Sequence, residues 1–299
     1  MTIEAVRTAD DRFANLPGYE FEPHYMADLA DFDGLRLHYL DEGPADAEQT
    51  FLCLHGQPTW AYLYRKMIAV FSPAGHRSVA PDYFGFGRSD KPVEDARYTF
   101  SFHRQSLIAL IERLDLTNIT LVCQDWGGML GLTLPMDMPD RFSRLLVMNT
   151  GIATGQSPGK GFDAWKAYVA ANPDFPIPGL MMRSIPGLTE AEAAAYDAPY
   201  PDSQYRAGVR RFPEIVPVTP DMDGVDLGLR AIEWWRHEWQ GQAFMAIGVQ
   251  DPVLGLEVMK GLKNIIRNCP EPLVLEDAGH FVQESGDQVA IAALDAWGG

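Results

Sequence analysis

One short segment places an aspartate where it could act as a nucleophile. The apolar run Ile119 to Cys123 predicts a strand, and Gln124-Asp125-Trp126-Gly127-Gly128 predicts a sharp turn that opens a helix. Such a nucleophile elbow strains its central residue and needs small neighbours, here Cys123 and Gly127. A carboxylate at this point can form an ester with a carbon that it attacks. The indole N–H of Trp126 is an uncharged donor, which suits a reaction in which a soft anion leaves.

Two further residues complete a candidate triad in the chain order nucleophile, acid, histidine. Asp251 follows the predicted strand Ala243 to Val249, and His280 follows a predicted strand that ends at Leu275. All three residues lie just past the carboxyl ends of predicted parallel strands, where open α/β sheets bind ligands. The sequence therefore predicts Asp125 as nucleophile, Asp251 as triad acid and His280 as general base.

The loop His55 to Trp60 follows the predicted strand Thr50 to Leu54 and can present a backbone N–H to a developing oxyanion. We expect the N–H groups of Gln57 and Trp126 to form an oxyanion hole. His55 is expected to tie the loop by hydrogen bonds. The segment that starts at Asp82 contains only a lone Gly-x-Gly, and the histidines are dispersed, so we expect no nucleotide site, no metal and no cofactor.

Around these residues, the chain alternates strand-like runs with helical patterns, which predicts an α/β layered domain with a mostly parallel sheet. The alternation stops after Asn149 and resumes near residue 221. The intervening stretch opens with a Gly/Ser/Pro-rich linker and then predicts short helices, at 162–171, at 189–196 with a capping box, and at 203–211. We predict a main domain of residues 1–150 and 221–299 and an inserted helical domain of residues 151–220.

The composition limits the possible partners and the location. The 299-residue chain is 46% hydrophobic, enough for a substantial core, and carries a formal net charge of −17, which argues against binding to nucleic acids or anionic membranes. The three scattered cysteines are typical of buried thiols in a reducing compartment. The N-terminus does not resemble a signal peptide, and no apolar stretch approaches membrane-spanning length. We therefore expect a cytoplasmic protein.

Three motifs together resemble the haloalkane dehalogenases: the elbow at 124–128, the loop at 55–60, and Asp277-Ala278-Gly279-His280-Phe281-Val282-Gln283-Glu284. The resemblance runs from about Phe13 to the last helix. More narrowly, the chain resembles the branch of that family whose triad acid follows the sixth strand and whose second halide-binding tryptophan lies in a helical cap. The cap motif Gly-Phe-x-Ala-Trp-Lys of that branch matches residues 161–166. The resemblance implies an α/β-hydrolase fold with an inserted helical cap, and halide binding by Trp126 and Trp165.

The same resemblance implies a reaction and a cavity. A small apolar haloalkane would yield a primary alcohol, a halide ion and a proton through an alkyl ester of Asp125, which a water activated by His280 would hydrolyse. No cofactor is implied, and we expect a monomer. Position 57 is Gln where some members have Glu or Asn, which leaves the backbone donor intact. The implied cavity lining consists of Phe162, Phe212, Pro213, Val216 and Leu254.

Three other functions remain to be weighed. Epoxide hydrolases also combine an aspartate nucleophile with a histidine, but need an acid, usually paired cap tyrosines; the inserted segment contains Tyr168, Tyr196, Tyr200 and Tyr205. Haloacid dehalogenases of similar fold hold a substrate carboxylate with arginines near the nucleophile, which this elbow lacks. A non-catalytic receptor on the same scaffold would be expected to lose a triad member. The tryptophans at 126 and 165 favour a halide.

Overall fold

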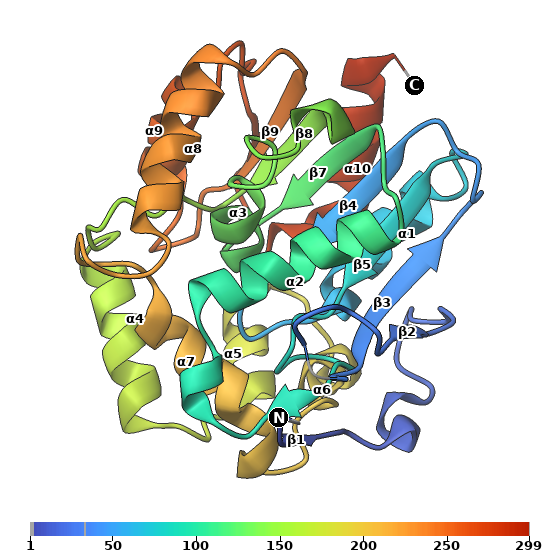
Figure 1. Cartoon of the computed structure of the whole chain (residues 1–299), viewed down its shortest axis with the longest axis vertical. Helices are drawn as coiled ribbons and strands as arrows, with labels where there is room; N and C mark the ends of the chain where they lie inside the picture. Colours follow the sequence, from blue (N-terminus) through green and yellow to red (C-terminus); the bar gives the residue numbers. More distant parts are fainter. Residues whose placement is uncertain (1–2, 33, 299) are drawn as a thin grey trace.

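The computed structural model describes residues 3–32 and 34–298 (Figure 1). Residues 1, 2 and 299, which include both ends of the predicted main domain, and residue 33 lie outside the described part. The strands in it are β1 (Ala5–Val6), β2 (His24–Met26), β3 (Leu37–Glu42), β4 (Thr50–Leu54), β5 (Arg77–Pro81), β6 (Lys91–Pro92), β7 (Ile119–Cys123), β8 (Phe142–Met148), β9 (Gln242–Gly248) and β10 (Leu273–Leu275).

The helices are mostly amphipathic and surround these strands. The α-helices of the described residues are α1 (Arg65–Phe71), α2 (Phe100–Arg113), α3 (Trp126–Gly131), α4 (Lys160–Ala171), α5 (Ile177–Ser184), α6 (Glu190–Asp197), α7 (Ala207–Ile215), α8 (Val225–His237), α9 (Leu256–Ile265) and α10 (Gly286–Trp297). Short 3₁₀ helices are η1 (Asp10–Phe13), η2 (Ala61–Tyr64), η3 (Asp95–Arg97), η4 (Pro139–Arg141), η5 (Ser203–Arg206) and η6 (Val282–Ser285).

The central sheet has eight strands in the order β10-β9-β8-β7-β4-β5-β3-β2. The six strands from β10 to β5 in this order run parallel, whereas β3 is antiparallel to both of its neighbours. Every residue of β4 and β7 is buried, as expected for a parallel sheet that is covered on both faces. Leu54 pairs with Cys123 at the carboxyl ends of these two strands, so the loop after β4 and the turn after β7 begin side by side.

The helices cover both faces of the sheet and one end of its strands. In Figure 1, α2 and α3 lie in front of the sheet, α1 and α10 pack against each other behind it, and the arrowheads of β4 and β7 point towards α4–α7. The stretch 151–220 holds α4, α5, α6, η5 and α7 and no strand. The predicted capping box is present at the start of α6, where Thr189 and Glu192 bond each other's backbone N–H groups.

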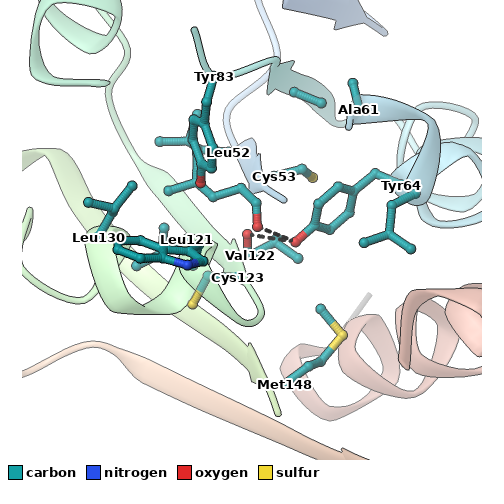
Figure 2. Packing of buried hydrophobic residues seen from close by; sticks show 14 of the residues in the cluster. Leu52, Cys53, Ala61, Tyr64, Tyr83, Leu121, Val122, Cys123, Leu130 and Met148 are labelled. Carbon is teal, nitrogen blue, oxygen red and sulfur yellow. Dashed lines mark hydrogen bonds between the residues drawn. The ribbon is translucent and has the colours of Figure 1, made fainter. Parts of the chain in front are cut away.

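The buried core extends to the carboxyl ends of β4 and β7. Figure 2 shows the Tyr64 ring buried among these strands; its hydroxyl donates to Leu54 O at 2.7 Å and lies 3.4 Å from Val122 O. Of the three cysteines, Cys53 and Cys123 are buried, Cys269 is partly buried, and all are free thiols. None of the described helices combines the length and the apolar character that crossing a bilayer requires.

The strands β1, β2 and β6 and the helix α5 were not predicted from the sequence. The three-residue edge strand β2 shows too little pattern to be recognised, and its presence makes β9 the seventh strand of the large sheet in chain order. Asp251 thus follows the seventh strand, and the expectation that the triad acid follows the sixth was wrong. Helix α5 was missed because Pro178 and Gly179 lie in its first turn, where proline is tolerated although both residues read as helix breakers.

Candidate active site

The elbow places Asp125 at the end of β7 with a backbone that few residues adopt. Its φ is 51° and its ψ is −125°, and it caps the start of α3. Its N–H donates to Asn149 O at 3.0 Å, and its carbonyl accepts from Thr150 Oγ1 at 2.7 Å. Gly127 passes so close to Leu54 O that a Cβ would collide with that carbonyl. These contacts hold the strained turn and project the carboxylate beyond the sheet.

The three predicted triad residues converge. Nδ1 of His280 lies 2.8 Å from Oδ2 of Asp251, and Nε2 of His280 lies 3.6 Å from Oδ2 of Asp125. The Asp251 side chain is fully buried, whereas those of Asp125 and His280 are 18% and 20% exposed. The imidazole of His280 therefore shields the Asp251 carboxylate from solvent, whereas the side chains of Asp125 and His280 remain partly accessible.

The two carboxylates control the protonation of the imidazole. Burial alone would lower the pKa of His280, but the negative charges of Asp251 and Asp125 on either side outweigh it and raise the pKa to about 10. Burial would raise the pKa of Asp251, but the charge of His280 and hydrogen bonds from His280, Asn149 and Val253 hold that pKa well below its usual range. Loss of the charge on Asp125 would remove part of what favours the imidazolium.

The two residues predicted to form an oxyanion hole, Gln57 and Trp126, differ in their contacts with the Asp125 carboxylate. Gln57 N–H donates to Oδ1 of Asp125 at 2.8 Å, and Trp126, the first residue of α3, has an N–H that the helix itself does not use. Gly56 approaches the Asp125 side chain so closely that a Cβ would collide with it. His55 is fully buried, lies 2.8 Å from Gly56 O through Nδ1, and accepts from Tyr83 N–H at 3.1 Å through Nε2.

A cavity of about 240 Å³ lies between the carboxyl ends of the strands and the helices α4, α5 and α7. Its lining is mostly apolar and consists of Gln57, Pro58, Asp125, Trp126, Met129, Pro158, Gly161, Phe162, Trp165, Leu180, Ser184, Pro213, Val216, Asp251, Pro252, Val253, Leu254, His280 and Phe281. Four of the five residues expected there, Phe162, Pro213, Val216 and Leu254, are among them.

Phe212 is the exception and corrects the expected lining. It is fully buried, and its ring packs against Trp126 with 4.6 Å between ring centroids. Its helix α7 turns this ring away from the cavity and into a cluster with Phe86 and His103, at 4.5 and 4.7 Å. Phe212 therefore supports the indole of Trp126 from behind.

The two tryptophans reach the cavity from different parts of the chain. Trp126 comes from the elbow and is 3% exposed, and Trp165 comes from α4. The Trp165 ring packs against Tyr168 and Phe175, with centroids 5.9 and 5.4 Å away. The sequence-predicted halide-binding residues thus face one shared space, each held by aromatic neighbours.

Two polar residues of the site were missed by the sequence analysis. Asn149 directly follows β8 and bridges three groups: its Nδ2 donates to Gly248 O at 2.8 Å and to Asp251 Oδ2 at 3.0 Å, and its Oδ1 accepts from Gly248 N–H at 2.9 Å. Gln124 lies against His280. The position of Asn149 at a strand end was the one available signal, and it is the same signal that identified Asp125.

The four tyrosines considered for epoxide chemistry do not line this cavity. Tyr196 is fully buried and bonds Glu284, and Tyr200 is 1% exposed with its hydroxyl 3.3 Å from Pro58 O. The Tyr168 side chain is exposed, and Tyr205 is partly buried against the core. Within the described residues, no group of three or more His, Cys, Asp or Glu side chains is arranged to hold a metal ion.

The fold and the site define the class of this protein. A mostly parallel eight-stranded sheet, a nucleophile elbow after β7, and an acid and a histidine after β9 and β10 characterise the α/β hydrolases. The family model described as "alpha/beta hydrolase fold" matches residues 49–287, which confirms the predicted fold.

Within that class, the chain belongs to the haloalkane dehalogenases, as its relatives show. It is 42% identical to the haloalkane dehalogenase of Psychrobacter cryohalolentis over 96% of both chains. It is 39% identical to the haloalkane dehalogenase of Mycolicibacterium paratuberculosis over 99% of this chain and 98% of the relative. Hydrolytic dehalogenation, predicted from the motifs, is thereby confirmed.

A solved structure is more similar still. The haloalkane dehalogenase DpaA of Paraglaciecola agarilytica is 55% identical, with a TM-score of 0.97 and coverage of 98% of this chain and 99% of the other. That structure is described as tetrameric. The expectation of a monomer therefore finds no support in this relative.

Proposed function

We propose that this enzyme cleaves the carbon–halogen bond of small haloalkanes through a covalent ester on Asp125. One observation carries the proposal: Oδ1 of Asp125 is held by the Gln57 N–H, while Oδ2 faces His280 and the apolar cavity. Oδ2 is thus free to attack the carbon that bears the halogen, in line with the departing halide. The C–O bond forms as the C–halogen bond breaks, and the halide leaves with the bonding electron pair.

The indoles of Trp126 and Trp165 receive the departing anion. Hydrogen bonds to charged groups contribute about 1.5–3 kcal/mol each. Two such bonds, made mainly in the transition state, supply ~3–6 kcal/mol, or roughly 10²–10⁴ in rate. Neutral donors fit this role because a cation would bind the product halide too tightly for release. Residues 151–220 would act as the cap that brings Trp165 to the cavity and keeps water out.

His280 then acts as general base in the second half-reaction. It takes a proton from water, whose oxygen attacks Cγ of the ester, and the oxyanion on Oδ1 is stabilised by the N–H groups of Gln57 and Trp126. The bond between Cγ and Oδ2 breaks, so the alcohol leaves with Oδ2 and Asp125 keeps the oxygen from water. Asp251 orients His280 and stabilises the imidazolium. The products are a primary alcohol, a halide ion and a proton.

A substrate panel tests this function. We expect release of bromide and chloride from short 1-haloalkanes, measured by ion chromatography, and no opening of epoxides of similar size, because the four candidate tyrosines lie outside the cavity lining. Epoxide opening without halide release would contradict the proposal.

Replacing Trp165 by phenylalanine should slow carbon–halogen cleavage roughly 10–150-fold and weaken halide binding, since one hydrogen bond to a charged group is lost. Single-turnover halide release and halide titration measure the two effects. The matched control is Trp234→Phe in α8, a tryptophan that packs against Trp235 and Trp239 away from the cavity, which should leave both values unchanged. Equal effects of the two substitutions would argue against a halide-binding role.

A further inference from the structure

The side chain of Gln124, the residue before the proposed nucleophile, is fully buried against His280. Its Nε2 lies 2.9 Å from Nε2 of His280 and donates to the His280 backbone carbonyl at 3.0 Å. Oδ2 of Asp125 is farther from the same imidazole nitrogen, at 3.6 Å. The Gln124 amide is therefore the nearer of these two groups to the nitrogen that must act as base.

The orientation of this amide follows from its other contacts. The His280 carbonyl can only accept a hydrogen bond, so the NH₂ of Gln124 must face it. On the other side, Oε1 of Gln124 lies 3.4 Å from Nε2 of Gln283, which also lies 3.2 Å from the Tyr64 hydroxyl. Turning the amide over would set an oxygen against the carbonyl and leave a buried acceptor unsatisfied, which is costly.

An NH₂ group that points at Nε2 needs a lone pair there, with the proton of the neutral imidazole on Nδ1. Nδ1 is the nitrogen that faces Asp251. We propose that Gln124 is a positioning residue that favours the unprotonated state of Nε2 of His280 once the ester has removed the charge of Asp125, and so maintains His280 as the base that hydrolyses the ester. This inference rests on the covalent mechanism proposed above.

The role of Gln124 follows from the charges around the imidazole. Asp125 on the elbow and Asp251 after β9 are the charged groups that face His280, and both favour the imidazolium. Formation of the ester removes the negative charge of Asp125. Asp251 then still favours protonation of His280, whereas the N–H of Gln124, which needs the lone pair on Nε2, disfavours it. When water binds between Nε2 and the ester carbon, Gln124 keeps its bond to the His280 carbonyl while the lone pair accepts the water proton.

The test is the pH dependence of ester hydrolysis in Gln124→Met, which keeps the length of the side chain and removes its donor. The alkyl-enzyme is formed with a 1-bromoalkane, and its decay is followed by quenched-flow mass spectrometry from pH 5 to 10. We expect the pH midpoint of decay to rise by about one unit, the effect of losing one hydrogen bond to the neutral base. The plateau rate at high pH, where His280 is already neutral, should change less than about twofold.

Two further variants sharpen the test. Gln124→Glu places an acceptor at Nε2 and should raise the midpoint further than Gln124→Met. Gln49→Met makes the same chemical change in a buried glutamine before β4, at the opposite end of the sheet, and should leave the midpoint unchanged. Thermal unfolding shows which variants are folded, and either folded Gln124 variant decides the question.

A third measurement needs no change at Gln124. In Asp125→Asn, which mimics the neutral ester, ¹⁵N shifts should show His280 as the neutral Nδ1–H form at pH 7. An imidazolium there, an unchanged midpoint in the folded Gln124 variants, or a lowered plateau without a shift would overturn the inference. Failure to detect any alkyl-enzyme in the wild-type protein would instead refute the covalent mechanism itself.

Discussion

Replacement of Asp125 by alanine is expected to abolish halide release, with a loss of about 10⁴-fold or more in turnover, as for other nucleophiles of catalytic triads. The remaining groups cannot substitute for it. In the proposed mechanism, His280 activates water against an ester carbon, and the indoles stabilise a halide only once a nucleophile has begun to displace it. Halide release over several hours, at substrate concentrations well above saturation of the wild-type enzyme, measures the loss.

The control for this experiment is Asp277→Ala. Asp277 is an exposed aspartate in the loop before His280 and is not part of the cavity lining, so its loss should leave turnover unchanged. Unfolding temperatures of both variants establish that the fold is retained. Substantial halide release by Asp125→Ala, above the rate without enzyme, would mean that water attacks the haloalkane directly and that no ester is required.

Replacement of His280 by alanine is expected to separate the two half-reactions. Asp125 keeps its contact with the Gln57 N–H and can still be alkylated, but the general base is lost, which typically costs 10²–10⁴ in rate. We therefore expect a burst of about one halide per active site, followed by very slow turnover. Intact-protein mass spectrometry should show a mass increase equal to the alkyl group, located on the peptide that contains Asp125.

The double variant Asp125→Ala/His280→Ala serves as the control and should show neither burst nor adduct. Reaction in ¹⁸O water adds a further check on the wild-type enzyme, because attack at Cγ leaves one labelled oxygen in Asp125 after a single turnover. An unmodified protein after the His280→Ala reaction would count against covalent catalysis. An adduct on another side chain would reassign the nucleophile.

Much of this enzyme could be predicted from the sequence because its chemistry follows local patterns. Apolar runs of three to seven residues mark the parallel strands, and the residues that follow each run must lie at the same edge of the sheet. This rule alone brought together Asp125, Asp251 and His280. Helices of the segment 151–220 were predictable where they carry start signals, such as the capping box of Thr189, and not where proline and glycine occupy the first turn, as in α5.

From the sequence we could predict the elbow, the chain order of the three triad residues and the family, because each depends on residues that lie close together in the chain. The tertiary structure alone decided which side chains share a surface across long separations. It turned Phe212 away from the cavity, showed through the edge strand β2 that Asp251 follows the seventh strand, and set the amides of Gln124 and Asn149 against the triad. Packing directions and hydrogen-bond partners of this kind depend on the distances between distant segments, and those distances exist only once the chain has folded.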